Sequence, residues 1–451
     1  MAIATKQELQ NYLELFESFE KRTSGPEYVR KLRQDAFARF WELGFPTLKD
    51  EDWRFTSLAP IASQNFELPL PARVTLEQVD AMAAPFANRI VFVNGRFAPG
   101  LSSTGALPKG VTVASLADSL TNPLLQRHLA EHEDFRNEAF TALNTAFIDD
   151  GAFVHVKRGI VAEQPIYVLY VSTGDSPQLI NPRNLIVADE QSQAVVVEDY
   201  VSLRTAGQES GATLSNVVTE LVAADDAVIS HYMIEREDTR SINVSTLSIR
   251  QGRNANVDSH SILTGGALVR NNVHPVLAGE GADCLINGLF VGNGRQHLDN
   301  YMKVEHASPH CNSRQFYNGI LDGHSRGVFH GRIIVHKDAQ KTDAKQTNRN
   351  LLLSDDAQID TKPQLEIYAD DVKCTHGATI GQIDEEALFY MRSRGIPDAE
   401  SRRLLLFAFA GECLERMKPG PVLEWLKHAL PAWLPMGTSP RQLLERGAPS
   451  K

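Results

Sequence analysis

The spacing of apolar positions divides the chain into regions with different expected structure. In the first 60 residues, apolar side chains recur every three or four positions, and Thr23–Pro26 separates two predicted amphipathic helices. Between Pro165 and Gly381, short β-type runs are broken by Gly, Asp and Asn, with no amphipathic helix among them. Helical spacing returns after Gly381. We therefore expect an N-terminal helical and mixed region, a strand-rich core and a C-terminal helical region with a tail, spanning residues 1–150, 151–383 and 384–451.

The strand-rich core contains a loosely repeated pattern. Regular strands without intervening helices are compatible with a sandwich, a barrel or a β-solenoid. A turn residue, a small residue and an apolar run recur, which favours the solenoid. The small residues are Ala194, Ala227, Ala255, Ala282, Gly327 and Ala357, at intervals of 33, 28, 27, 45 and 30. The predicted strands are Ile166–Val171, Asn184–Val187, Ala194–Glu198, Val217–Val222, Val228–Tyr232, Val244–Ile249, Ser259–Leu263, Leu285–Phe290, Gly327–Val335, Asn350–Leu353 and Gln364–Tyr368.

Composition narrows the class of protein. A chain of 451 residues is expected to form two or three domains. Its formal net charge of −11 gives no general reason to bind nucleic acid or anionic membranes. There is no apolar run of about 20 residues and no secretory signal at the N-terminus. Four cysteines lack CxxC spacing, so we expect a reducing, cytoplasmic setting.

The segment Asp370–Ile396 carries the strongest candidate chemistry. A β-type run is predicted to end in a Cys-Thr-His-Gly turn, with a helix following. Cys374 and His376 alternate along extended backbone, so their side chains should share one face. Thiolate and imidazole are ligands that suit iron–sulfur chemistry. The alternative is structural: Cys374 is a buried strand residue and His376 bonds the turn backbone.

Other candidate sites are less well defined. His306, His310 and Cys311 have the residue types of a metal site, but the intervening Ala-Ser-Pro favours a loop. No phosphate-binding glycine loop and no nucleophile elbow are present. An alternative function is a carbohydrate-active enzyme with a β-helix groove, and a third is a purely structural solenoid. The acids considered for the enzyme follow no evident register; they are Asp258, Asp283, Asp299 and Glu305.

Three separated segments resemble one known family. Lys49–Leu58 (KDEDWRFTSL), Leu143–Ile166 (LNTAFIDDGAFVHVKRGIVAEQPI) and Asp370–Ile396 are similar, in this order, to segments of the SufD family. That family supplies a scaffold subunit of the SUF iron–sulfur cluster assembly system. The resemblance implies a right-handed parallel β-helix core and a non-catalytic scaffold. It also implies pairing with the SufB paralogue and docking of the ABC-type ATPase SufC.

The resemblance assigns roles to particular residues. It places His376 at the interface with the paralogue, as a metal contact, with Cys374 as a neighbour. The paralogue carries a functional cysteine near the position of Asn348, so this chain is expected to be the SufD-type partner. We expect no tightly bound cofactor, a transient cluster at the heterodimer interface, and a homodimer when the chain is alone. The implied ATPase-docking residues are Glu386, Phe389, Tyr390, Arg392, Arg394, Arg402 and Arg403.

Overall fold

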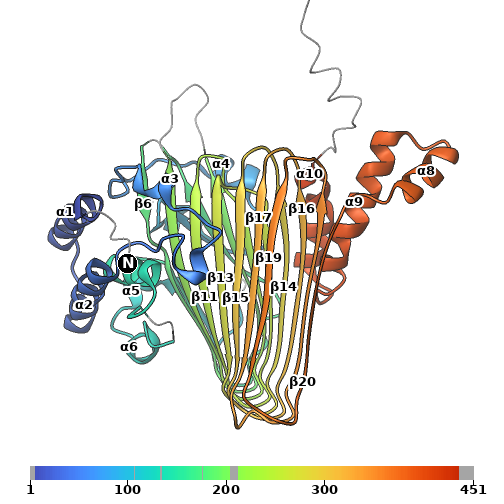
Figure 1. Ribbon diagram of the computed structural model, residues 1–451. Helices are drawn as coiled ribbons and strands as arrows, with labels where there is room; N and C mark the ends of the chain where they lie inside the picture. The colour runs from blue at the N-terminus through green and yellow to red at the C-terminus, as the bar shows by residue number, and fades with distance from the viewer. Residues whose placement is uncertain (1–5, 106, 133–134, 175, 204–211, 436–451) are drawn as a thin grey trace, which may run out of the picture.

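Two long, mostly parallel sheets form the core, which winds as a β-solenoid of about seven turns (Figure 1). The computed structural model describes residues 6–105, 107–132, 135–174, 176–203 and 212–435. Sheet B has the strand order β2-β1-β5-β8-β10-β12-β14-β16-β18-β20, and sheet A the order β19-β17-β15-β13-β11-β9-β7-β4-β3, with β6 beside β9. The predicted fold class, a parallel β-helix core flanked by helical regions, is confirmed.

Successive strands of the solenoid alternate between the two sheets. Sheet B contains β1 (Asn88–Val93), β2 (Arg96–Phe97), β5 (Ile166–Ser172), β8 (Gln193–Ser202), β10 (Val228–Arg236), β12 (Asn256–Leu263), β14 (Asp283–Gly292), β16 (Asn312–Leu321), β18 (Asp343–Leu352) and β20 (Lys373–Gly381). Sheet A contains β3 (Val111–Ser115), β4 (Ala152–Val156), β6 (Gln178–Ile180), β7 (Arg183–Ala188), β9 (Thr213–Ala223), β11 (Ile242–Gln251), β13 (Leu268–Leu277), β15 (His297–His306), β17 (Arg326–Val335) and β19 (Gln358–Ile367).

One corner of the solenoid repeats the same backbone conformation. Two positions before each of six successive sheet B strands, the residue has a positive φ between 51° and 72°; these residues are Gln191, Asp226, Asn254, Gly281, His310 and Lys341. The next residue is small or short and fully buried: Ser192, Ala227, Ala255, Ala282, Cys311 and Thr342. The predicted repeat is therefore real at Ala227, Ala255 and Ala282. Gly327 lies in β17 and Ala357 directly precedes β19, so the anomalous interval of 45 marks a change from sheet B to sheet A.

Among the described strands of eight or more residues, four have no counterpart among the predicted ones: β13, β15, β16 and β20. In β13, β15 and β16 the inward positions include amides, which weakens the expected apolar alternation. Asn271 in β13 donates to Asn300 in β15 at 3.4 Å, and both side chains are buried. Because a buried amide can bond the amide of the next rung, polar strands can still pair inside a solenoid, although Asn300 Nδ2 has no hydrogen-bond partner among the described residues.

Helices from both ends of the chain cover the outer faces of the sheets (Figure 1). α1 (Lys6–Arg22) and α2 (Glu27–Leu43) confirm the predicted N-terminal helices, and with α7 (Ala139–Ala146) they pack on the early strands of sheet A. α9 (Asp398–Leu414) and α10 (Pro421–Trp433) pack on the outer face of sheet B. α9 and α10 thus cover a side of the solenoid.

Shorter helices fill the connections: η1 (Glu51–Trp53), α3 (Ala59–Ala62), α4 (Leu76–Met82), η2 (Pro99–Leu101), α5 (Leu116–Ser119), α6 (Pro123–His128) and α8 (Glu385–Ser393). Asn94 and Gly95 form a tight turn that joins β1 to β2. Among the described residues, no helix is long and apolar enough to cross a membrane. The tail predicted at residues 437–451 lies outside the described residues.

The first end of the solenoid is closed by strands of the opposite direction. β2 pairs antiparallel with β1, and β3 pairs antiparallel with β4, so each sheet starts with a strand that is not part of a turn. Behind them, Phe153 of β4 packs with Leu116 of α5 and Leu185 of β7 in a separate buried cluster. Short antiparallel end strands of this kind cover the edge of a parallel array.

Candidate functional site

The last rung of the solenoid, β19 and β20, is left bare at its outer edge. Both strands are the terminal members of their sheets. No residue of either strand is fully buried, and β20 is exposed at all but one of its nine positions. Large apolar side chains lie at this rung, with Tyr368 62%, Ile380 51% and Ile367 41% exposed. An uncovered edge with exposed apolar side chains is the geometry that pairs with another strand.

Cys374 and His376 both lie within β20. The predicted Cys-Thr-His-Gly turn is wrong, because β20 stays paired with β18 from Lys373 to Gly381 and the turn comes earlier, at Asp370–Val372. In the parallel register Cys374 lies opposite Ala344, and His376 lies opposite Gln346. The predicted alternation therefore places both side chains on the inner face of the open rung.

The two side chains have different surroundings. Cys374 is partly buried and packs against the apolar interior of the solenoid. Burial, together with the nearby Asp343 carboxylate, raises the pKa of the Cys374 thiol above its ordinary value. His376 is exposed at the open end. The protonated thiol is a weak ligand, so the imidazole is the more available of the two candidate groups.

Asn348 is a structural residue in the interior behind this rung. Its side chain is fully buried, donates to the carbonyl oxygen of Tyr317 at 3.2 Å and accepts from Asn350 at 2.7 Å. The position where the resemblance expects a cysteine in the paralogue is thus filled here by a hydrogen-bonded amide.

The expected docking residues form a two-helix arm. α8 and the start of α9 extend away from the strands (Figure 1), and Asp384 caps α8 by accepting from the backbone of Glu386 and Ala387. Four apolar side chains, here called the arm patch, are exposed on it: Phe389 72%, Tyr390 58%, Leu404 42% and Phe407 36%. Several exposed apolar side chains on two neighbouring helices are typical of a protein-binding site.

The arginines of the arm are mostly engaged within the arm. Arg402 donates to Asp398 at 2.9 Å and lies 4.0 Å from Glu385, so its position in the first turn of α9 is explained by pairing inside the chain. The Arg394 guanidinium lies over the Tyr390 ring. Arg403 is exposed.

With this geometry in place, comparison with known proteins decides the family. The family model described as the SUF system FeS cluster assembly SufBD core domain matches residues 170–409, and the SufBD protein N-terminal region matches residues 6–168. The chain belongs to the SufBD family. Iron–sulfur cluster assembly protein SufD of Escherichia coli is 33% identical over 414 residues, covering 91% of this chain and 93% of that protein. An iron–sulfur cluster assembly SufBD family protein of Synechocystis is 33% identical over 393 residues, covering 85% of this chain and 86% of its own length.

Within the SufBD family the chain is SufD-like, as the resemblance in its sequence predicted. Iron–sulfur cluster assembly protein SufD of Bacillus subtilis is a further relative, 26% identical over 91% of this chain and 94% of that protein. The family match extends through the solenoid to α9, so it includes both the open rung and much of the arm.

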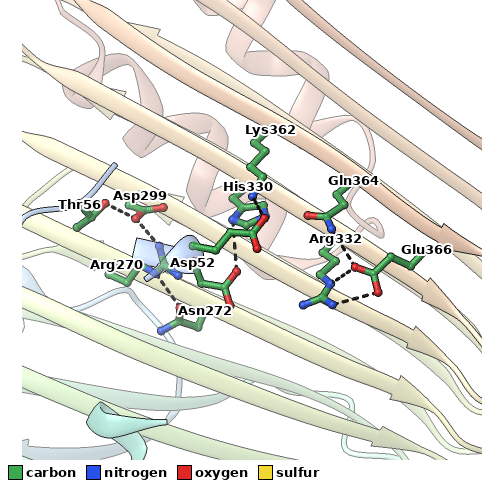
Figure 2. Close-up of polar contacts among 11 residues, drawn as sticks. Asp52, Thr56, Arg270, Asn272, Asp299, His330, Arg332, Lys362, Gln364 and Glu366 are labelled. Carbon is green, nitrogen blue, oxygen red and sulfur yellow. Dashed lines mark hydrogen bonds and ion pairs between the residues drawn. The ribbon is translucent and has the colours of Figure 1, made fainter. Parts of the chain in front are cut away.

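A third feature of this SufBD-family chain was not predicted. Residues 51–56, here called the strap, lie across the outer face of sheet A (Figure 2). Arg270 of β13 lies over the Trp53 ring at 4.4 Å and donates to Asp299 of β15, which also accepts from the Thr56 hydroxyl. Arg270 and Asp299 are almost fully buried beneath the strap. The segment Lys49–Leu58 that carries the family resemblance is therefore a structural clamp.

The strap continues to the last rung (Figure 2). Asp52 lies 3.9 Å from His330 of β17, and Lys362 of β19 donates to Glu51 at 2.7 Å. Burial lowers the pKa of His330 below its ordinary value. The strap thus contacts four successive strands of sheet A and ends at the strand whose outer edge is open.

The other candidate metal ligands, His306, His310 and Cys311, do not form one site. His306 bonds the Ser313 hydroxyl at 2.8 Å, and the Cys311 thiol contacts the Gly279 carbonyl oxygen at 3.3 Å. His310 occupies the positive-φ corner. No group of three or more metal-ligating side chains occurs in the part of the chain that the structure describes.

The acids considered for an enzyme groove are dispersed. Asp258 and Asp283 belong to sheet B, whereas Asp299 and Glu305 belong to sheet A. Asp258 pairs with Lys418 at 2.6 Å, and Glu305 pairs with Lys303 at 2.7 Å. Asp258 and Glu305 are each paired with a nearby lysine. The four acids do not gather in one groove, as the enzyme alternative would require.

Proposed function

We propose that this chain is the SufD-type scaffold subunit of an iron–sulfur cluster assembly complex and catalyses no reaction by itself. The bare last rung carries the proposal, because a parallel solenoid that ends on an open, partly apolar edge is completed by another chain. The partner would be a SufB-type paralogue with a functional cysteine. The chain alone would form a homodimer through the same edge, in the cytoplasm.

His376 would act at this interface. Its imidazole lies on the inner face of the rung, where a partner strand would cover it. The cluster is cargo in this proposal: iron and sulfide would be held transiently between His376 and the partner's thiolate, with Cys374 alongside. Neutral imidazole can replace a thiolate ligand in such a cluster, which fits the shared site.

The arm patch would dock the ABC-type ATPase of the SufC type. Phe389 and Tyr390 project from α8, and aromatic side chains are the residues that most often dominate binding energy at an interface. Arg403 would extend the contact on α9, with Glu386, Arg392 and Arg394 around it. Arg402 would support the patch indirectly through its bond to Asp398.

The test uses the full chain, expressed with both partners and purified without oxygen. His376→Ala should leave the complex intact and reduce cluster maturation at least tenfold, measured as the activity of an iron–sulfur client enzyme. The matched control is His324→Ala, which changes an exposed histidine on a distant turn. Normal maturation with His376→Ala would contradict the role of His376, and failure to recover any paralogue would contradict the scaffold proposal.

Docking is tested separately by the ATPase alone. Phe389→Ala should weaken binding of the ATPase at least tenfold, because a buried aromatic anchor commonly supplies about 2 kcal/mol or more. Leu76→Ala is the control, since Leu76 is a similarly exposed apolar side chain on α4. Equal binding by the two variants would place the docking surface elsewhere.

A further inference from the structure

The interior column behind His376 differs from the interior column behind Cys374. In register with His376 are Gln346 of β18 and Gln315 of β16, whose side chains are 1% and 2% exposed. In register with Cys374 is Ala344, which offers only a methyl group. Asn348 and Asn350 lie in register with Ala378 and Ile380, whose own side chains are apolar. Among the inward positions of β20, His376 is therefore the one where a ring nitrogen of the open rung stands in register with a buried amide side chain.

The two glutamines leave hydrogen-bonding capacity unused. Gln346 Nε2 donates to Gln315 Oε1 at 2.8 Å. Gln346 Oε1 and Gln315 Nε2 are buried and have no hydrogen-bond partner among the described residues. A buried polar atom without a partner costs about 1–3 kcal/mol, so its retention calls for a physical reason.

The opposite strand is shaped around the Gln346 amide. Gly331 of β17 faces Gln346 across the interior, and a Cβ at Gly331 would lie 1.8 Å from Gln346 Nε2. A side chain at Gly331 would therefore displace the amide. Gly331, the hydrogen bond to Gln315 and the strand register together fix the position of the Gln346 side chain.

We propose that Gln346 is a positioning residue for His376, an inference that rests on the proposed function. Adjacent strands lie about 4.8 Å apart, so an imidazole turned inward from His376 comes within reach of Gln346 Oε1. That oxygen accepts the N–H of one ring nitrogen when a partner covers the rung. The lone pair of the other nitrogen is then directed at the iron–sulfur cargo, as an outer partner commonly orients a metal-binding imidazole.

The test measures the ring of His376 directly. The chain is labelled with ¹⁵N in its histidines, assembled with the cysteine-bearing paralogue, and its His376 tautomer is determined from the ring ¹⁵N shifts. The native complex should contain one tautomer. Gln346→Met, which keeps the length and removes the acceptor, should give a mixture of tautomers, and Gln346→Glu, which keeps an acceptor, should restore the single tautomer.

Two further variants make the result decisive. Thr375→Val changes the exposed outward neighbour in β20 and should leave the tautomer unchanged. Gln346→Leu provides a second removal of the acceptor if Gln346→Met does not fold. An unchanged tautomer in a folded variant that lacks the acceptor would overturn the positioning role.

The failure of this inference is distinguishable from failure of the proposed function. If His376→Ala abolishes maturation while the tautomer ignores Gln346, only the positioning role is wrong. If His376→Ala matures clusters normally, the role that the proposed function gives to His376 is wrong whatever the tautomer does. With both correct, Gln346→Met should lower maturation about tenfold without changing the affinity of the chain for its paralogue.

Discussion

The two ends of the solenoid are built from the same rungs but finish differently. At the first end, β2 and β3 run antiparallel to their neighbours and close the sheets, with Phe153 only 1% exposed behind them. At the last end, β20 is the outermost of the described strands in sheet B, and Ile380 is 51% exposed. A repeat protein needs both ends closed to be stable alone, so the difference separates a stabilising end from a binding end.

The largest expected difference between the ends is in stability. Phe153→Ala should lower the free energy of unfolding by about 3–5 kcal/mol, because it leaves a cavity in a fully buried cluster. Ile380→Ala at the open rung should change it by no more than about 0.5 kcal/mol. Urea unfolding followed by circular dichroism compares the two. Similar losses for both variants would mean that the last rung is as well packed as the first.

The free energy of unfolding should fall at acid pH, in part because His260 is buried on the side of the solenoid that the C-terminal helices cover. Burial beneath α9 lowers the pKa of His260 to about 3, against an ordinary value near 6.5. Between these pH values the unfolded chain binds a proton that the folded chain does not, so stability falls as the pH falls, by at most about 1.4 kcal/mol per pH unit. His260→Phe should reduce this slope, measured by urea unfolding at several pH values. His324→Phe, an exposed control, should leave it unchanged.

Pairing at the open rung should be sensitive to single backbone donors. Lys373 donates its N–H to Thr342 before β18, and donors alternate along a parallel strand, so the N–H of Ala378 points to the open edge. Ala378→Pro removes this donor and should weaken association with the paralogue about tenfold, measured by analytical ultracentrifugation. Ala378→Val keeps the donor and serves as control. If both variants bind equally well, the edge of β20 is not the pairing strand.

The smallest effect is expected where the strap meets the last rung. Lys362→Ala removes the bond to Glu51, which is an exposed pair screened by water. The unfolding midpoint in urea should not change measurably. Arg270→Ala, at the buried part of the strap, should lower it clearly because Asp299 would be left buried without its cation. A large effect of Lys362→Ala would show that the strap stabilises the open rung.

The fold could be predicted from the sequence where buried apolar side chains recur at the regular spacing of a helix or a strand. Phe16 and Phe37 recur at helical spacing, and both lie in the buried contact between α1 and α2. The strands that were not predicted carry inward amides such as Asn271 and Asn300, whose bonds to neighbouring rungs replace apolar contacts. Hydrophobic alternation does not detect such strands, because the satisfaction of their polar groups depends on another turn of the chain.

The candidate site was predictable in part. Alternation along an extended backbone placed Cys374 and His376 on one face, but Gly377 suggested a turn where β18 in fact holds the strand straight. The strap was not predictable, because Glu51 and Lys362 are 311 positions apart in the chain. Contacts of that range depend on the assembled solenoid and leave no local pattern in the sequence.

The attachment of α9 has a mechanical consequence. Its buried face rests on β14 and β16, with Asn318 of β16 donating to the carbonyl oxygen of Phe409 at 2.8 Å. The arm is therefore anchored on β14 and β16, the strands of sheet B that precede β18 and β20. Since β16 pairs with β18 and β18 pairs with β20, two strand pairings connect the base of the arm to the bare rung.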